Sequence, residues 1–374
     1  MIKIKAGVLQ NALKLNAGAV SKNAVSEYFS CVLIQYQDSK LLFTSTNYDC
    51  RIQSTTKDFS GEVEDFCIEY TTLLQIASKY SADDELQIVI DEGFAKITKG
   101  RSSAKIQLLE VINFPQGIDI EEVKKVVNFN KQDLLDAINI TKISIYANEN
   151  RYNINGLHFN FQAQSKKIDV VSTDGHRLSK FEIEDPELSF DAKITIPKKI
   201  TLEIAKILSD IKGEAVIKMF ITNGKIKIDF GNGTLITKLI DAEFPNYSSV
   251  IPKDNRILIQ TSKPDISKSL DRVLSIADAL EPRLIVNINE SVMTLKMNNN
   301  VNEKIEEIDC KTNKPFYFFV NAVYLKECVN ALPSSKCVIT ATESRLPMIV
   351  KDGEDARFLY VIMPMKSWEQ SNGN

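Results

Sequence analysis

The stretch Asn155–Gly175, NGLHFNFQAQSKKIDVVSTDG, holds two runs in which polar and apolar residues alternate, joined by a polar segment. Alternation with a period of two is typical of strands that bury one face, so this stretch predicts a β-hairpin. A second stretch at 283–300, RLIVNINESVMTLKMNNN, has the same pattern. The turn pair Asn223 and Gly224 before the alternating run 225–230 indicates another hairpin. Hairpins therefore recur along the chain.

Segments with helical periodicity lie between these strands. Apolar residues spaced three and four positions apart predict six short helices. Asn130, Asp265 and Asn321 lie near the starts of three of them and are candidate N-caps, because their side-chain oxygens can accept a hydrogen bond from a free backbone N–H. We expect the helices at roughly residues 8–15, 72–80, 132–143, 199–208, 266–276 and 322–332.

The order of strands and helices repeats. Each third of the chain begins with a strand and a Leu-rich helix and continues through hairpins. It then has a second strand and helix, as at 67–80, 194–208 and 318–332. The period of about 125 residues is longer than any solenoid repeat. A Phe-Pro pair lies at the end of the first two copies, at 114–115 and 244–245.

These observations predict an α+β fold with three repeated domains, each with two helices packed on antiparallel sheets. The length of 374 residues also exceeds what one hydrophobic core usually organises. We place the domains at 1–126, 127–253 and 254–374.

The composition bounds the class of protein. Hydrophobic residues make up 44% and charged residues 25% of the chain, which is typical of a globular protein. The net charge of -3 argues against a protein that coats nucleic acid with its whole surface, but it allows a local basic face. The absence of a long apolar run and of a signal-peptide pattern predicts a soluble, cytoplasmic protein. The six cysteines form no C-x-x-C pair, so we expect buried, reduced thiols.

The stretch VSTDGHRL at 171–178 concentrates Ser172, Asp174 and His176 and invites a hydrolase interpretation. Adjacent positions on one strand provide no oxyanion hole, however, and there is no G-x-S-x-G elbow. His158, the other histidine, alternates with Leu157 and Phe159, so we expect it on a strand surface. Two histidines without a third ligand make a weak metal site. No phosphate-binding glycine motif is present. We therefore expect no catalytic residue, metal or cofactor, and a hydrolase stays the least favoured alternative.

Lysine and arginine residues occur on or just before the predicted helices, together with acidic residues. Solvated helix faces explain such a mixture. A surface for nucleic acid would follow only if the fold brought all six helices to one side.

Four segments occur in order along the chain: RYNINGLHF at 151–159, STDGHRL at 172–178, FPNYSSVIP at 244–252 and YVIMPM at 360–365. Together they resemble the motifs of bacterial DNA sliding clamps, the beta subunit of DNA polymerase III. The resemblance covers the whole chain. It implies domains of the DNA-clamp type and two protomers that dimerise head to tail into a closed ring around duplex DNA. The implied function is that of a non-enzymatic processivity factor, working in the cytoplasm at the nucleoid.

The resemblance also implies partners: a second copy of the chain, the alpha subunit of the replicative polymerase, the clamp loader and other proteins with clamp-binding motifs, but no membrane. Peptides of such partners dock in an apolar pocket between the second and third domains. The matching positions are Ile154, Thr173, Gly175, His176, Arg177, Leu178, Pro245, Val250, Val361, Met363, Pro364 and Met365.

Further positions follow from the same resemblance. The dimer contact would join the strand around 104–108 to the third domain, with Ile106, Leu108 and Ile276 as candidates. The chain continues past the last motif into a tail, 367–374, which we expect near the pocket rim, where it could modulate peptide access. A peptide-binding scaffold that never encircles DNA is the alternative.

The candidate DNA contacts are Lys22, Asn148, Arg151, Tyr152, Lys198 and Lys199.

Overall fold

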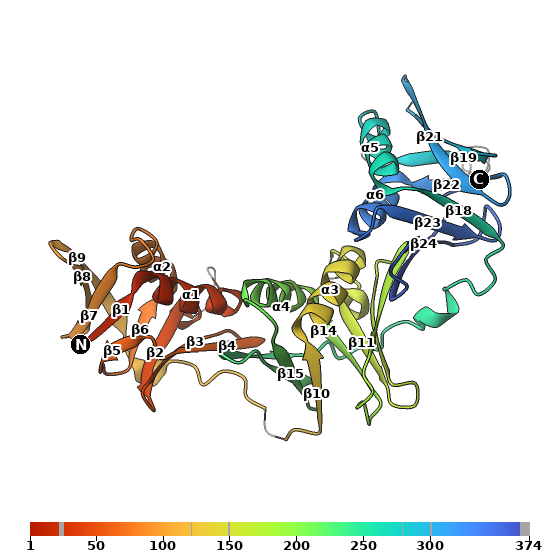
Figure 1. Ribbon diagram of the computed structural model, residues 1–374. Helices are drawn as coiled ribbons and strands as arrows, with labels where there is room; N and C mark the ends of the chain where they lie inside the picture. The colour runs from red at the N-terminus through yellow and green to blue at the C-terminus, as the bar shows by residue number, and fades with distance from the viewer. Residues whose placement is uncertain (22–25, 121, 149, 279, 300, 367–374) are drawn as a thin grey trace. The chain divides into compact units, whose positions relative to one another are not determined.

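The computed structural model describes residues 1–21, 26–120, 122–148, 150–278, 280–299 and 301–366. This part of the chain forms six α-helices and two sheets in which neighbouring strands run antiparallel (Figure 1). The predicted α+β class is therefore confirmed. The elements follow one order three times: a strand, a helix, a group of strands, a second helix and three more strands.

The first repeat runs from β1 to β9. It includes β5, which has no counterpart in the later repeats, and the short 3-10 helices η1 (Ala17–Ala19), η2 (Glu27–Ser30) and η3 (Val111–Asn113). Its main elements are β1 (Ile2–Lys5), α1 (Ala6–Asn16), β2 (Cys31–Gln37), β3 (Lys40–Thr46), β4 (Cys50–Thr56), β5 (Phe59–Gly61), β6 (Phe66–Glu69), α2 (Tyr70–Ala77), β7 (Glu85–Asp91), β8 (Phe94–Lys99) and β9 (Ser102–Leu109).

The second repeat runs from β10 to β17. The 3-10 helices η4 (Lys142–Ser144) and η5 (Tyr152–Ile154) lie within it, and η6 (Tyr247–Ser249) follows it. Its main elements are β10 (Lys125–Asn130), α3 (Lys131–Thr141), β11 (Gly156–Gln162), β12 (Lys167–Thr173), β13 (Arg177–Glu184), β14 (Ala192–Pro197), α4 (Lys198–Asp210), β15 (Val216–Ile221), β16 (Lys225–Asp229) and β17 (Gly233–Lys238).

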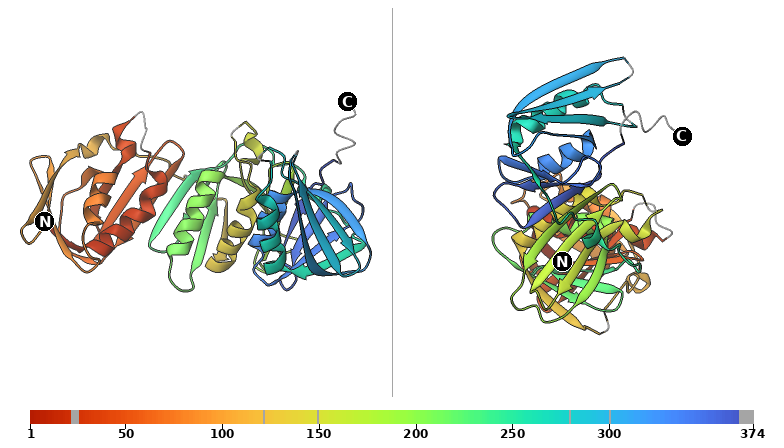
Figure 2. Two further views of the ribbon diagram at one scale, coloured as in Figure 1. Left: turned by 90° about the horizontal axis from the view of Figure 1, so that it is seen from above. Right: turned by 90° about the vertical axis from the view of Figure 1, so that its right-hand side faces the viewer.

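The third repeat runs from β18 to β25. Its helices α5 and α6 pack side by side, as α1 and α2 do in the first repeat (Figures 1 and 2). Its elements are β18 (Ile257–Ser262), α5 (Lys263–Leu274), β19 (Arg283–Asn289), β20 (Val292–Asn298), β21 (Glu303–Thr312), β22 (Phe316–Asn321), α6 (Ala322–Ala331), β23 (Lys336–Ala341), β24 (Met348–Asp352) and β25 (Phe358–Ile362).

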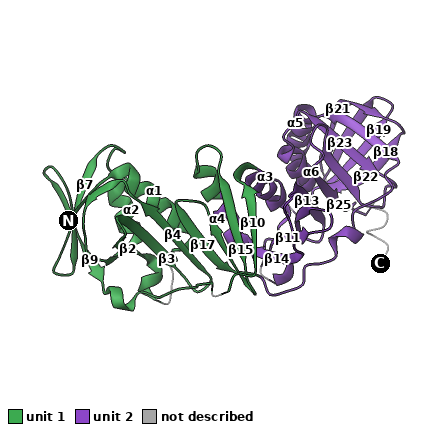
Figure 3. Ribbon diagram, turned by 60° about the horizontal axis from the view of Figure 1, so that its bottom comes forward, with its two compact units in different colours: residues 1–132, 206–239 green, residues 133–205, 240–374 purple. Residues whose placement is uncertain are grey.

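The chain divides into two compact units, and each contains one whole sheet (Figure 3). Unit 1 comprises 1–132 and 206–239, and unit 2 comprises 133–205 and 240–374. The second repeat supplies strands to both: β10 and β15 to β17 belong to the sheet of unit 1, and β11 to β14 belong to that of unit 2. The boundaries expected for three domains stay a prediction.

The same kind of strand pairing joins successive repeats within each sheet. In unit 1, β4 of the first repeat pairs with β17, the last strand of the second. In unit 2, β13 of the second repeat pairs with β25, the last strand of the third. The equivalent strands that remain are β21 and β9. Among the described residues, one side of 303–308 in β21 and of 102–107 in β9 has no strand partner.

A repeated turn precedes β4, β13 and β21. The side-chain oxygen of Asn47 accepts hydrogen bonds from two backbone N–H groups of the turn, as do those of Asp174 and Asn299. Asn and Asp favour such turns because their side chains hydrogen-bond the backbone two residues ahead. Asp174 therefore has a structural role that the first and third repeats give to asparagine.

Helix starts are set by capping side chains. Asn321 accepts hydrogen bonds from two backbone N–H groups of α6, as predicted. The N-cap of α5 is Ser262, whose hydroxyl accepts from the Asp265 N–H, so the prediction of Asp265 as the cap is wrong. Pro264 lies at the first turn of α5, where its missing N–H costs no hydrogen bond, and the helix consequently begins earlier than predicted.

Candidate functional site

A cavity of about 310 Å³ lies within unit 2. Ten of the twelve residues that the sequence grouped as a peptide pocket line it. The two exceptions are Pro364 and Met365, which follow Met363; the Met365 N–H instead donates to the Phe319 carbonyl at 2.8 Å. The lining consists of Arg151, Asn153, Ile154, Thr173, Gly175, His176, Arg177, Leu178, Phe244, Pro245, Asn246, Tyr247, Val250, Val361 and Met363.

The floor of this pocket is apolar. Ile154, Leu178, Phe244 and Val361 belong to one buried cluster, to which Val171 and Ile349 contribute from below, and Tyr247 packs against it. No carboxylate is among the lining residues, whereas Arg151 and Arg177 are. A concave apolar site with few polar groups is suited to bind an apolar side chain of a ligand, with neutral or acidic groups at its rim.

Gly175 allows the turn and the rim to approach closely. Its φ of +88° is favourable only for glycine, and a Cβ atom there would lie 2.9 Å from Nη1 of Arg151. Arg151, which the sequence assigned to DNA, therefore lies at the rim of the pocket, with its guanidinium 5.5 Å from the centre of the Tyr146 ring.

Arg177 ties this turn to helix α6. Its guanidinium pairs with Asp174 at 3.0 Å and with Glu327 at 2.5 Å, and it lies 4.4 Å from the centre of the Tyr324 ring. It also donates to the Ile143 carbonyl at 2.6 Å. Burial alone would lower the pKa of Arg177, but the hydrogen bond and charge of Glu327 raise it above its ordinary value. Arg177 is thus a permanently charged structural tie.

The triad-like residues do not form a hydrolytic site. Ser172 is fully buried and its hydroxyl donates to the Thr141 carbonyl, so a substrate cannot reach it. The Asp174 carboxylate binds the turn backbone and Arg177. The His176 ring stacks on Tyr324 with 6.3 Å between ring centres. Each side chain has a role in holding the pocket wall.

Five lining residues were not predicted for the pocket: Arg151, which was assigned to DNA, and Asn153, Phe244, Asn246 and Tyr247. Three of them lie in the FPNYSSVIP segment that carried the resemblance, so the signal was present. The Tyr247 hydroxyl donates to Asp169 at 2.7 Å and accepts from Asn160 at 2.8 Å. Burial and the Asp169 carboxylate raise the pKa of Tyr247 above its ordinary value. This network anchors the 244–250 wall on strands β11 and β12.

His158 is buried, which corrects the expectation of a surface histidine. Its ring is 4% exposed and stacks on Phe244 with 4.4 Å between ring centres and an interplanar angle of 8°. Nδ1 lies 3.0 Å from the Thr195 hydroxyl. Burial, with a smaller effect of Lys193, lowers the pKa of His158 to about 4. His158 is therefore neutral at pH 7 and supports the pocket wall from behind.

Five of the six residues expected at DNA lie in described parts of unit 2, and Lys22 lies outside the described residues. Asn155 connects the segment that holds Asn148 to the one that holds Lys198. Its side chain donates to the Asn148 carbonyl, and its own carbonyl accepts from the Lys198 N–H. The loop before β11 and the start of α4 are thus adjacent. Asn148, Tyr152 and Lys199 are exposed, and Lys198 is half-buried.

The candidate dimer residues are placed differently from one another. Ile106 is 9% exposed and its side chain belongs to the core of unit 1, against which Leu108 is packed. Ile276 is half-buried, and its carbonyl accepts a hydrogen bond from Asn299. Contacts by Ile106 to another chain are therefore limited to its backbone.

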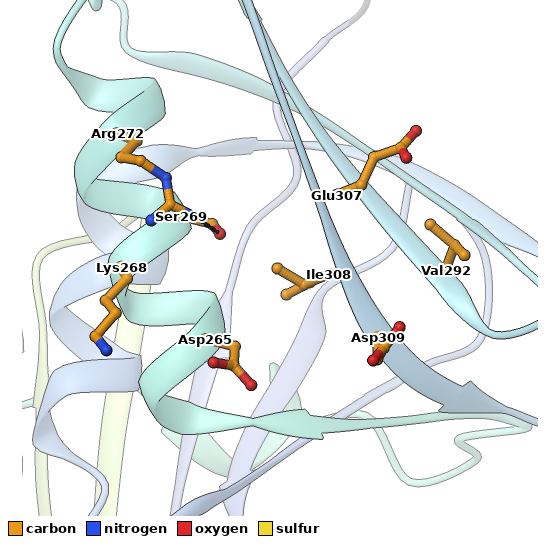
Figure 4. A pocket seen from close by; sticks show the side chains of 8 residues that line it. All are labelled: Asp265, Lys268, Ser269, Arg272, Val292, Glu307, Ile308 and Asp309. Carbon is orange, nitrogen blue, oxygen red and sulfur yellow. Dashed lines mark hydrogen bonds between the residues drawn. The ribbon is translucent and has the colours of Figure 1, made fainter.

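A second cavity, of about 470 Å³, lies between α5 and the strands β20 and β21 (Figure 4). It is strongly charged. Lys268 and Arg272 line it from the helix, and Glu307 and Asp309 from β21. Val292 of β20, which pairs with Asp309, also lines it.

All six cysteines are buried, as predicted. Among the described residues, no cluster of three or more His, Cys, Asp or Glu side chains is arranged to hold a metal ion. None of the helices in the described ranges is long and apolar enough to cross a membrane.

Three family models match consecutive parts of the chain. They describe the DNA polymerase III beta subunit: its N-terminal domain over residues 1–118, its central domain over 128–246 and its C-terminal domain over 248–366. The beta sliding clamp of Caulobacter vibrioides is 26% identical over 374 residues, covering 98% of this chain and 99% of that protein. That of Haemophilus influenzae is 23% identical, covering 96% and 97%.

Solved structures have the same fold. The DNA polymerase III subunit beta sliding clamp of Pseudomonas aeruginosa bound to griselimycin matches with a TM-score of 0.92 at 20% identity, covering 98% of this chain and 99% of that chain. The corresponding clamp of Bartonella birtlesii bound to griselimycin matches with a TM-score of 0.91 at 23% identity, with the same coverage.

The buried state of His158 predicts a loss of stability in acid. An unfolded histidine has a pKa of 6.5, whereas His158 titrates at about 4, so the unfolded chain binds the extra proton between these values. The free energy of unfolding therefore falls as the pH drops from 6.5 to 4, by about 3 kcal/mol from this group. Urea unfolding of the wild type and of His158→Gln across this range measures the difference. Parallel pH profiles for the two proteins would contradict the assignment.

Proposed function

Since the chain belongs to the DNA polymerase III beta subunit family, we propose that two copies of it close head to tail into a ring around duplex DNA. The protein acts as a sliding clamp, a processivity factor that tethers the replicative polymerase to its template. It is not an enzyme. The observation that carries ring closure is that β21 and β9 are equivalent to strands that pair between repeats, yet have no such partner among the described residues.

The repeat specifies how these edges pair. β4 pairs with the last strand of the following repeat, and so does β13. The third strand of this kind, β21, belongs to the third repeat. A second copy of the chain supplies a partner for it, because β9 is the last strand of a first repeat. Two such contacts, related by a twofold axis, close a ring in which every strand of this kind is paired with the last strand of another repeat.

The register of this contact follows from the repeated turn. Ile52, Ser179 and Lys304 each lie five residues after the turn residues Asn47, Asp174 and Asn299. Ile52 pairs with Leu235 and Ser179 pairs with Tyr360. Leu235 and Tyr360 lie five residues before Ile240 and Met365, whose N–H groups donate to the carbonyls of Thr195 and Phe319, each three residues before the second helix of its repeat. In the first repeat Leu109 pairs with Cys67, which has the same place before α2, so the equivalent position is Ala104, five residues before Leu109. Lys304 is therefore expected to pair with Ala104 of the partner.

This register places opposite charges together. Glu303 faces Lys105 of the partner, and Glu307 faces Arg101. Oppositely charged residues directly across an antiparallel pair attract, with Cβ atoms roughly 5 Å apart.

The contact with DNA is electrostatic in this proposal. Lys198 and Lys199 lie at the start of α4, beside the loop that carries Asn148 and Tyr152. Phosphate contacts hold the duplex without reading its sequence, which allows sliding. Retention then depends on the closed ring rather than on affinity, which is compatible with the net charge of -3. We place this function in the bacterial cytoplasm, at the nucleoid.

The pocket of unit 2 is the docking site for partner peptides in this proposal. The cavity is apolar with cationic groups at its rim, and it is anchored by Arg177 and Tyr247. The polymerase alpha subunit, the clamp loader and other proteins with clamp-binding motifs would share this one site. Pro364 and Met365 follow Met363 without lining the cavity, and the flexible Met363 side chain can adapt to different ligands. The tail 367–374 lies outside the described residues, so its expected place at the pocket rim stays a prediction.

Ring closure predicts topological retention on DNA. Protein loaded onto nicked circular duplex DNA should remain bound through gel filtration at moderate salt, and it should be released when the DNA is cut at a single site. A ring slides off a free end, whereas a surface-bound protein stays on both forms. Equal retention on circular and linear DNA, or none on either, would exclude the ring and favour a peptide-binding scaffold.

Charge reversal tests the register. Lys105→Glu places like charges against Glu303, so the dimer Kd should rise roughly tenfold at low salt. Glu303→Lys should do the same, and the double variant should regain most of the affinity. Sedimentation equilibrium measures the Kd, with the exposed Lys218→Glu as a matched control. Single variants that dimerise like the wild type would contradict the register.

Griselimycin, which two of the relatives bind, is a probe for the pocket. Val250→Glu should weaken its binding at least roughly tenfold, because Val250 is 44% exposed, lines the apolar cavity and would bring a charge into it. Val216→Glu alters a similarly exposed valine in unit 1 and should leave binding unchanged. Calorimetric titration distinguishes the two variants. Equal affinities would mean that this cavity is not the binding site.

A further inference from the structure

The last strands of the three repeats begin at equivalent residues. β9, β17 and β25 each begin two residues before the position that fixes the register, which is Ala104, Leu235 or Tyr360. The residues directly before these strands are Arg101, Asn232 and Arg357. These three residues therefore have the same place, at the end of the loop that leads into the last strand.

A backbone hydrogen bond marks this place in both junctions within the chain. The donor is the N–H group eight residues after the turn residue: Thr55 donates to the Asn232 carbonyl at 2.8 Å, and Glu182 donates to the Arg357 carbonyl at 2.7 Å. In the third repeat the equivalent donor is Glu307. In the proposed ring, its acceptor is the carbonyl of Arg101 from the second copy.

The side chain of Arg357 reaches helix α3. Its guanidinium pairs with Asp133, the third residue of α3, at 3.0 Å, and it lies 5.1 Å from the centre of the Phe181 ring. The hydrogen bond and charge of Asp355 raise the pKa of Arg357, and the charges of Asp133 and Asp136 on the helix add to this effect. An arginine before the last strand of one repeat thus ties that strand to the first helix of the preceding repeat.

The charged cavity beside α5 has the equivalent place in the third repeat (Figure 4). Asp265 is the third residue of α5, as Asp133 is of α3, and Glu307 is equivalent to Glu182. Both Asp265 and Glu307 line this cavity of about 470 Å³. In Figure 4 the Asp265 side chain extends from α5 toward β21. A cavity therefore lies where the second repeat holds the side chain of Arg357.

The charges that line the cavity favour a further cation. Its three carboxylates are those of Asp265, Glu307 and Asp309. Arg272, one of the two cations in the lining, is already paired with Glu306 at 2.7 Å, so the carboxylates face one further cation, Lys268. Within the described ranges, no residue forms an ion pair with Asp265. A guanidinium in the cavity would gain a partner of opposite charge on the helix.

Arg101 has the complementary character. It is exposed, and no residue of the described ranges forms an ion pair with it. Asp355 binds Arg357 from two residues earlier in the chain, but the equivalent residue before Arg101 is Lys99, which pairs with Asp84. The guanidinium of Arg101 is therefore not held by its own loop and is available to another chain.

We propose that Arg101 of one copy of the chain inserts into the charged cavity of the other copy and pairs with Asp265. The inference rests on the proposed ring, and it extends the contact between the two copies from the strand edges to helix α5. Lys268 lies where the second repeat has Asp136, so it repels the same guanidinium and lowers the affinity. Both the pair and this repulsion weaken as salt is added.

Removal of either charge tests the pair. Arg101→Ala and Asp265→Asn should each raise the dimer Kd roughly tenfold at low salt. The double variant should be no weaker than either single variant, because the same interaction is lost in each case. Sedimentation equilibrium measures the Kd. Lys57→Ala, which removes another exposed cation of the first repeat, is the matched control and should leave the Kd unchanged.

Lys268→Asp gives a prediction of the opposite sign, which a loss of folding cannot imitate. It restores the carboxylate that the second repeat has at this position, so it should lower the dimer Kd several-fold. In the Arg101→Ala background the same substitution should have a much smaller effect, because the guanidinium that it attracts is absent.

The outcomes separate this pair from the ring itself. A wild type that stays monomeric at micromolar concentration, or that is lost from circular DNA, would overturn the ring and the pair together. A wild type that forms the ring while Arg101→Ala and Asp265→Asn dimerise equally well would overturn the pair alone. Effects that add in the double variant would do the same, as would an equal effect of Lys268→Asp in both backgrounds.

Discussion

The structure depends on one backbone interaction, the pairing of a hairpin strand in one repeat with the last strand of the next. An unpaired strand edge exposes a row of N–H and C=O groups and readily binds another strand. The chain satisfies two such edges internally, by β4 with β17 and by β13 with β25. This is why each sheet contains strands from two repeats, and why the compact units do not coincide with the repeats. By the same constraint, we expect β21 of one copy of the chain to pair with β9 of another.

The pocket of unit 2 lies beside one of the turns that precede these paired strands, the turn before β13. Asn47, Asp174 and Asn299 form the same turn, but the next residues differ. Where the first repeat has Tyr48, 65% exposed and packed on the Phe29 ring, the second has Gly175, which leaves space for a cavity. Asp174, one of the residues that suggested catalysis, thus stabilises the turn, and the absence of a side chain at Gly175 leaves space for the cavity.

The sequence predicted the elements well because alternation and helical periodicity are local signals. It could not predict which strands pair between repeats, because the strands that pair in this way have the same alternating pattern as any other strand. His158 illustrates the limit: alternation placed it on the outer face, but its cover, Phe244, comes from a distant segment. Asp265 failed as an N-cap because Ser262 lies before a proline that starts the helix earlier. The pocket residues came from motif resemblance, and Tyr247 was missed although it lies in one of the motifs. Its hydrogen bond to Asp169, on another strand, could not be predicted from local signals.

Hydrogen exchange of the two free edges is the most direct test of this account. In purified protein at micromolar concentration, the backbone amides of 102–107 and 303–308 that point away from β8 and β20 should be protected, and dilution below the dimer Kd should remove that protection while the neighbouring strands stay protected. Fast exchange of these amides in a protein whose mass is that of a dimer would mean that the subunits associate through another surface. The account of a ring closed by strand pairing would then be wrong.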